Sequence, residues 1–198
     1  MTAVAGRIGP NCLIRTVQAL EERLGTDAAR AWLVAHGHQD LTERLPESMV
    51  PEADFHALAG HVLDGLGAET GLAVLDRSGV LTAEYLLAHR IPAPARLLLP
   101  HLPSRLGLRI LARAIGAHAW TFAGSGRFSV RLTGDPVFAI AGCPMCRGRH
   151  ASRPTCSYYR ATFEHLLRRL IHPRLTVAEV ACEAVGSTAC EFRITLPR

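Results

Sequence analysis

Lysine is absent from this sequence: all 22 basic side chains of the chain are arginine. A lysine Schiff base and a lysine amine acting as a base are therefore excluded as catalytic devices. Aromatic residues are also scarce, at 6% of the chain. The net charge of +5 allows nucleic acid, an acidic membrane surface or carboxylate ligands as partners. Because no recognisable nucleic-acid motif accompanies the arginines, we expect no nucleic-acid partner.

A long apolar run is missing as well. No stretch approaches the roughly 18 apolar residues of a membrane-spanning helix, and the N-terminal segment MTAVAGRIGP lacks the apolar core of a signal peptide. The chain has six cysteines, and without an export signal these indicate reduced thiols or metal ligands rather than disulfides. We therefore expect a cytoplasmic protein, with peripheral contact as its only form of membrane association.

The first half of the chain has the spacing of helices. Apolar residues recur at helical intervals in the segments 11–24, 26–34, 51–66, 68–89 and 104–119. Gly71 and Gly79 weaken the 68–89 pattern. Several prolines limit any helix at 94–99 to a short one, and the polar mixture at 38–50 favours a loop.

The second half changes to the alternation of strands. Strand-like runs are WTFAG (120–124), RFSVRL (127–132), PVFAIAG (136–142), LTVAEVAC (175–182) and ACEFRITL (189–196). A helix is predicted from near Cys156 to Leu170. GSG (124–126) is interpreted as a hairpin turn, because it lacks the third glycine of a nucleotide loop and a strand follows it.

The order of these elements predicts an α+β fold, in which an antiparallel sheet is backed by helices. We expect one integrated domain, composed of an N-terminal helical portion (1–117) and a sheet-containing C-terminal part (118–198). At 198 residues the chain is long enough for one domain with a helical extension.

Most of the cysteines lie in the last third of the chain, at Cys143, Cys146, Cys156, Cys182 and Cys190. The predicted elements bring thiols from a helix start and two strands together, so a tetrahedral Zn²⁺ bound by sulfur, with one oxygen from Glu179, fits this pattern. A site closed by four protein ligands is structural. The Cys143-x2-Cys146 spacing is also typical of a redox pair or of half of a zinc site, in which these thiols would bind the ion in place of Glu179. A third alternative is that the pair belongs to a four-cysteine iron–sulfur cluster.

The spacing of Cys156, Glu179, Cys182 and Cys190 resembles the C-terminal signature of the V4R (4-vinyl reductase) domain family. Further stretches resemble the J-protein family of bacteriochlorophyll biosynthesis, which is named for 4-vinyl reduction: RIGPN (7–11), EYLLAHRIP (84–92), HAWTFAGSGRF (118–128) and YRATFEHLLRRL (159–170). This resemblance implies a structural zinc on those four ligands. It also implies a fold related to haem-NO-binding and TRAPP-type domains, with a pocket between helices and sheet.

The family name claims the reduction of a vinyl group on a tetrapyrrole, which requires an electron source. The sequence has no Rossmann fingerprint and no P-loop, and a closed zinc site cannot deliver electrons. The resemblance therefore favours a protein that binds a Mg-tetrapyrrole intermediate and presents it to another bacteriochlorophyll biosynthetic enzyme. The alternative is a C8-vinyl reductase that acts on divinyl (proto)chlorophyllide with an external reductant. A ligand sensor is a third class, but the sequence shows no DNA-binding or ATPase motif.

Candidate tetrapyrrole-binding residues lie in the stretches that most resemble the family: His89, Arg90, His118, Trp120 and Arg127. Arginine can pair with the carboxylates of the macrocycle, and histidine can coordinate its Mg²⁺. A lone histidine is more often a surface or core residue, so only the clustering of these residues in family-like stretches supports the assignment.

Arginines also repeat every four residues in the segment 104–119, at Arg105, Arg109 and Arg113. This repeat is typical of the solvated face of a helix that packs on the core. The less favoured interpretation is a basic surface for ligand carboxylates, a partner enzyme or anionic lipid.

Overall fold

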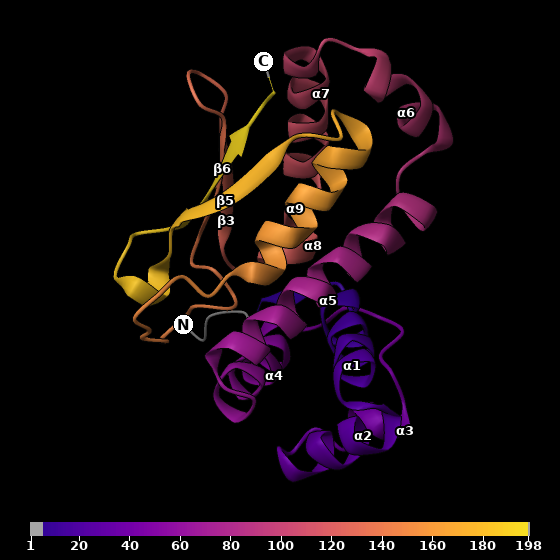
Figure 1. Ribbon diagram of the computed structural model, residues 1–198, viewed down its shortest axis with the longest axis vertical. Helices are drawn as coiled ribbons and strands as arrows, with labels where there is room; N and C mark the ends of the chain where they lie inside the picture. The colour runs from indigo at the N-terminus through magenta and orange to yellow at the C-terminus, as the bar shows by residue number, and fades with distance from the viewer. Residues whose placement is uncertain (1–5, 198) are drawn as a thin grey trace.

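The computed structural model describes residues 6–197 (Figure 1). The helices are α1 (Asn11–Leu24), α2 (Thr26–Ala35), α3 (Asp40–Glu43), α4 (Glu52–Gly65), α5 (Ala68–His89), α6 (Ala93–Leu98), α7 (Ser104–Ala117), α8 (Trp120–Ala123) and α9 (Ser157–Leu170). Short 3₁₀ turns are η1 (Leu99–His101) and η2 (Glu183–Val185). The strands are β1 (Arg7–Ile8), β2 (Val50–Pro51), β3 (Arg127–Arg131), β4 (Val137–Ala141), β5 (Thr176–Ala181) and β6 (Cys190–Thr195).

The main sheet is antiparallel throughout, in the order β3-β4-β6-β5. Alternate side chains of β6 point inward, so Cys190, Phe192 and Ile194 are buried while Arg193 is exposed. Helix α9 covers one face of the sheet and lies between it and α5 (Figure 1). The expected α+β fold, with an antiparallel sheet backed by helices, is confirmed.

Aromatic rings, rather than a cavity, occupy the contact between α9 and the sheet. Phe163 on α9 packs edge-on against Phe138 of β4 and Phe192 of β6, with ring centroids 5.3 Å apart in both pairs. Phe128 and Tyr159 complete this cluster. The pocket that the family resemblance implied between helices and sheet is therefore filled by side chains at this contact.

Helix α5 is the longest helix of the described chain and touches α1 and α4 on one side and α9 on the other. At its closest approach to α9, Gly79 lies against the backbone of Tyr158. Ser78 binds Thr16 of α1 through their hydroxyls at 2.9 Å. The N-terminal helices and the sheet thus meet through α5 and α9, and the single integrated domain stays a prediction.

The helix predictions for 11–24, 68–89 and 104–119 agree with α1, α5 and α7, and the short helix expected at 94–99 is α6. The polar segment 38–50 contains the short helix α3.

The strand predicted for WTFAG (120–124) is wrong, because this segment forms α8. Its carbonyls have partners other than a strand: the Gly9 N–H donates to Thr121 O at 2.7 Å, and the Tyr159 hydroxyl donates to Phe122 O at 2.8 Å. The GSG turn consequently joins α8 to β3 instead of two strands.

None of the helices in residues 6–197 is both long and apolar enough to span a bilayer.

The carboxylate of Glu52, at the start of α4, joins three distant parts of the chain. It accepts hydrogen bonds from the Ser125 N–H at 2.8 Å and the Ser125 hydroxyl at 2.6 Å, and it pairs with Arg147. Its side chain is only 9% exposed. Burial raises the pKa of Glu52, but the hydrogen bonds from Ser125 and Arg147 outweigh it and lower the pKa below its usual value.

We expect Glu52→Gln to lower the free energy of unfolding by about 2 kcal/mol, because a buried acceptor of charge-assisted hydrogen bonds becomes an amide that also presents donors to Arg147. Urea unfolding measures this loss. The matched control is Glu47→Gln, since Glu47 pairs with Arg44 where both side chains are 79% exposed, and such a pair contributes little. An equal effect of the two substitutions would contradict the prediction.

Candidate metal centre

Five thiols come from four different elements and meet at one end of the main sheet. Cys143 and Cys146 lie in the loop after β4, Cys156 precedes α9, Cys182 follows β5, and Cys190 begins β6. All five are buried, with exposures of 2% or less. The sequence predicted this convergence for Cys156, Cys182 and Cys190. It also named Cys143 and Cys146 as alternative ligands, and the structure places both in the same cluster.

The spacing between the sulfurs matches a metal site. The Cys146 Sγ lies 3.0 Å from that of Cys156, 3.4 Å from that of Cys182 and 3.6 Å from that of Cys190. Cys190 Sγ is 3.4 Å from Cys156 Sγ and 4.0 Å from Cys182 Sγ. Thiolates at about 2.3 Å from a tetrahedral Zn²⁺ lie about 3.8 Å from one another. A disulfide would bring two sulfurs to about 2.05 Å, and all six cysteines are free.

Glu179 reaches the same cluster from β5. One of its carboxylate oxygens, Oε2, accepts a hydrogen bond from the Cys156 N–H at 2.9 Å. The other, Oε1, is buried and has no hydrogen-bond partner. Burial raises the pKa of Glu179 to about 9, and the neighbouring Cys182 contributes to the same increase. A buried carboxylate oxygen without a donor is what a bound cation would satisfy, so these residues fit a metal ion.

The five thiols of the cluster differ in the direction of their pKa shifts. Hydrogen bonds from Cys143 and the other thiols lower the pKa of Cys146. Cys146 raises the pKa of Cys182, but contacts with Cys156 and Cys190 outweigh it and bring that pKa to about 5. Burial raises the pKa of Cys156 well above its usual value. Burial also raises the pKa of Cys143, and the contact with Cys143 raises that of Cys190. A buried group of thiols keeps few of its members deprotonated, whereas a divalent cation favours the thiolate form of every cysteine that binds it.

Two carboxylates outside the cluster hold the Cys143–Cys146 loop. Glu183, on η2, accepts the Cys143 N–H at 2.9 Å and the Gly142 N–H. Arg147, directly after Cys146, pairs with Glu52. The Glu183 N–H itself points to Cys190 Sγ at 3.4 Å. The loop is therefore positioned by bonds from α4 and η2.

The ligand atoms form two overlapping sets of four, each within 4.8 Å of one another. One set consists of Cys143, Cys146, Cys156 and Cys190, and the other of Cys156, Glu179, Cys182 and Cys190. The second is the set implied by the family resemblance. Cys156 and Cys190 belong to both sets, so either set would use them as ligands.

The candidate tetrapyrrole residues are exposed and lie in separate places. His89 ends α5 and Arg90 follows it, whereas His118, Trp120 and Arg127 lie around α8 and the start of β3. Figure 1 shows the C-terminal end of α5 apart from α8. His118 Nδ1 is 2.9 Å from the carbonyl oxygen of Ala114, and Trp120 is 61% exposed. The structure does not gather these five residues into one site.

A hollow next to the end of α5 contains residues that sequence reasoning missed. It has a volume of about 410 Å³ and is lined by Glu84, Leu87, Ala88, Arg96, His165, Arg169 and Leu170. His89 and Arg90 directly follow its α5 wall. Burial lowers the pKa of His165, which favours a neutral imidazole. The residues come from α5, α6 and α9, so only the tertiary structure brings His165 near Arg96. The periodicity of the sequence gives no indication that these two residues are neighbours.

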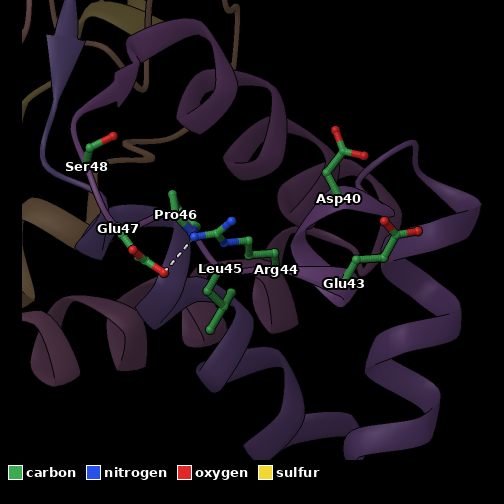
Figure 2. A pocket seen from close by; sticks show the side chains of 7 residues that line it. All are labelled: Asp40, Glu43, Arg44, Leu45, Pro46, Glu47 and Ser48. Carbon is green, nitrogen blue, oxygen red and sulfur yellow. Dashed lines mark hydrogen bonds and ion pairs between the residues drawn. The ribbon is translucent and has the colours of Figure 1, made fainter.

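A second hollow, of about 510 Å³, lies on the surface around α3 and the loop after it. Figure 2 shows Asp40 and Glu43 beside the Arg44–Glu47 ion pair, with Leu45, Pro46 and Ser48 from the same segment. Acidic side chains dominate this wall. It is therefore poorly suited to an apolar macrocycle that carries carboxylates.

A family model described as the V4R domain matches residues 136–196, the part that contains all six candidate ligands. Over nearly its full length, the chain is 41% identical to the bacteriochlorophyll synthase 23 kDa chain of Cereibacter sphaeroides, across 99% of this chain and 93% of that protein. It is 39% identical to the protein of the same name from Rhodobacter capsulatus, across 94% and 85% respectively. The chain belongs to the family of bacteriochlorophyll synthase 23 kDa chains. The family resemblance seen in the sequence is confirmed.

Two solved structures resemble the fold of this family member. An H-NOX protein from S. oneidensis in its Fe(II)NO state matches with a TM-score of 0.60 and 10% identity, over 96% of this chain and 100% of that one. The phenol-responsive sensory domain of the transcription activator PoxR, with phenol, matches with a TM-score of 0.53 and 14% identity, over 83% and 88%. At such identities the likeness shows the fold alone, and it confirms the expected similarity in fold to haem-NO-binding domains.

Proposed function

We propose that this chain is an accessory protein of bacteriochlorophyll biosynthesis that binds a Mg-tetrapyrrole intermediate and presents it to a biosynthetic enzyme. The observation that carries this proposal is the hollow between α5, α6 and α9. It joins two arginines, one glutamate, a half-buried histidine and apolar side chains in a member of a family named for a bacteriochlorophyll synthase.

The side chains of this hollow suit a large apolar ring with acidic groups. Leu87, Ala88 and Leu170 offer an apolar wall, and Arg96 and Arg169 can pair with propionate carboxylates. Arg96 is already oriented, because its Nη1 donates to Leu87 O at 3.0 Å.

His165 would supply the ring nitrogen for the central Mg²⁺, since its lowered pKa keeps the imidazole neutral and able to coordinate. His89 and Arg90 are proposed to extend the rim of this site. The tetrapyrrole roles of His118, Trp120 and Arg127 stay a prediction, because these residues lie around α8 and β3.

We further propose that the metal of the cysteine cluster is a structural Zn²⁺. Held by four protein side chains, Zn²⁺ supplies cross-links and offers no open position to a substrate. Cys156, Glu179, Cys182 and Cys190 would tie the start of α9 to the ends of β5 and β6. In the alternative set, Cys143 and Cys146 take the places of Glu179 and Cys182. The centre would thereby fix α9, which carries His165 and Arg169.

The relatives are named as chains of a synthase, which supports a partner that receives the pigment. A peripheral position at a membrane is part of the proposal, since the pigment is apolar. In this scheme the chain binds and delivers the intermediate, and its own residues break no covalent bond.

The test incubates the metal-replete protein with a divinyl Mg-tetrapyrrole and NADPH, separates protein from pigment by gel filtration, and identifies the pigment. We expect unchanged pigment that elutes with the protein and has a shifted absorbance. Conversion to the 8-ethyl form would overturn the carrier in favour of a vinyl reductase that takes electrons from an external source.

Substitutions then locate the site. We expect His165→Ala and Arg169→Ala each to weaken pigment binding by about tenfold, the loss typical of one coordinate or charge-assisted bond. His150→Ala is the matched control, because His150 is exposed and lies in the loop before α9. Loss of binding in His118→Ala with none in His165→Ala would move the site to the α8–β3 region.

A further inference from the structure

The segment 91–117, called here the α6–α7 corner, forms one end of the long axis of the molecule (Figure 1). It lies inside a stretch without acidic residues, because no aspartate or glutamate occurs between Glu84 and Asp135. Arginines in this stretch are Arg90, Arg96, Arg105, Arg109, Arg113, Arg127 and Arg131. The +5 charge of the chain is therefore unevenly distributed, and this region carries only positive charge.

The corner also exposes large apolar side chains. Leu97 and Leu98 on α6 are 70% and 64% exposed, and none of the α6 residues is buried. On α7, Leu106 and Ile110 are each 47% exposed.

The pattern on α7 is two-sided. Its buried residues, Gly107, Leu108, Leu111 and Ala112, pack on the protein. Leu106 and Ile110 are one turn apart on the opposite face, where Arg109 and Arg113 lie beside them at helical spacing and are exposed. The outward face of α7 thus combines apolar and basic side chains.

We propose that the α6–α7 corner docks on the surface of a membrane that contains anionic lipid. Leucine and isoleucine side chains enter the boundary between headgroups and acyl chains, and the surrounding arginines bind lipid phosphates while their stems cover apolar surface. The contact is peripheral, since none of the described helices can span a bilayer.

The charge of the corner argues for lipid over a second copy of the chain. Two corners placed face to face would oppose arginines with no carboxylate between residues 85 and 134 to neutralise them, and like charges in contact are unfavourable. An anionic bilayer supplies negative charge at every position and needs no shape match.

Docking at the corner would also bring the pigment hollow to the membrane, because Arg96 of α6 belongs to both. The docking rests on the peripheral membrane position in the proposed function and names the surface responsible, and a test without pigment separates it from the pigment-binding role.

The first test is flotation of the metal-replete full chain with phosphatidylcholine vesicles, with and without phosphatidylglycerol, in the absence of pigment. We expect binding only to the anionic vesicles, and a loss of about tenfold or more in Leu106→Gln/Ile110→Gln. The control is Val34→Gln/Leu45→Gln, which changes side chains of similar exposure, 50% and 40%, outside the corner. Circular dichroism and zinc content check that all variants fold.

The second test removes charge. We expect Arg109→Gln/Arg113→Gln to weaken vesicle binding by about fivefold for each arginine, and added salt to weaken wild-type binding by screening. Arg23→Gln/Arg153→Gln, exposed elsewhere, should bind as the wild type does. The proposal would be overturned if the protein bound neutral and anionic vesicles equally, or if corner and control variants lost vesicle binding to the same extent. It would also be overturned if the protein were a dimer that dissociates in the corner variants.

Discussion

Cys190→Ser is expected to lose the bound zinc and most of the folded structure. Cys190 Sγ lies within 4.0 Å of three other thiols and belongs to both candidate ligand sets, and a serine hydroxyl is a poor ligand for Zn²⁺. A structural zinc contributes on the order of 10 kcal/mol, which is comparable with the whole stability of a domain. Zinc analysis of the purified protein and its thermal unfolding measure both losses.

Cys12→Ser is the control for this experiment. Cys12 is also buried, but it lies on α1, where its thiol donates to Gly9 O at 3.1 Å. We expect this variant to keep its zinc. If Cys190→Ser retained both its metal content and its melting temperature, the cluster would not be a zinc site.

The fourth ligand can be assigned with the same assay. We expect Cys143→Ser to retain zinc, since Cys143 is not in the set implied by the family resemblance and belongs only to the alternative set of four cysteines. An equal loss of zinc in Cys143→Ser and Cys190→Ser, with retention in Glu179→Gln, would favour an all-cysteine site.

The candidate metal ligands show what sequence spacing can and cannot predict. The spacing of Cys156, Glu179 and Cys182 resembles a family signature and predicts that these residues lie together, and the structure brings them together. The arrival of Cys146 at the same cluster depends on the loop after β4 folding back. Long-range bonds from Glu183 and from Arg147 to Glu52 hold that loop, and such bonds leave no periodic trace in a sequence.

The segment WTFAG shows a different reason for failure. A short run rich in β-branched and aromatic side chains is typical of a strand, but a strand also needs a neighbouring strand to bond with. Here Gly9 and Tyr159 take the carbonyls of Thr121 and Phe122, so tertiary contacts outweigh local preference. In the same way His165 gains its position only when α9 packs beside the end of α5.

The glycines of α5 show that a feature which weakened a prediction can have a packing role. Gly71 and Gly79 interrupt the helical pattern of 68–89, yet α5 is continuous. Close contact with neighbouring helices explains their presence, because a Cβ at residue 71 would lie 2.6 Å from Val62 O on α4. One at residue 79 would overlap the carbonyl oxygen of Tyr158 on α9. Each glycine is where another helix comes closest.

Gly79→Ala is therefore expected to destabilise the protein by about 3 kcal/mol, the upper range for an extra methyl group in a well-packed core. Besides the overlap with Tyr158 O, the new Cβ would lie 3.0 Å from the Cβ of Ala161. The overlap can be removed only if α5 and α9 move apart. Such a movement would displace Phe163 of α9 and Cys156, the residue directly before α9. The midpoint of urea unfolding measures the loss.

Gly116→Ala is the matched control, because Gly116 is also helical, on α7, and a Cβ there would meet nothing within 4 Å. Alanine stabilises an exposed helix position relative to glycine by up to about 1 kcal/mol. The same substitution should thus have opposite signs at the two sites. A stabilising Gly79→Ala would mean that α5 and α9 are not in contact at this point, and the position assigned to His165 beside α5 would have to be given up with it.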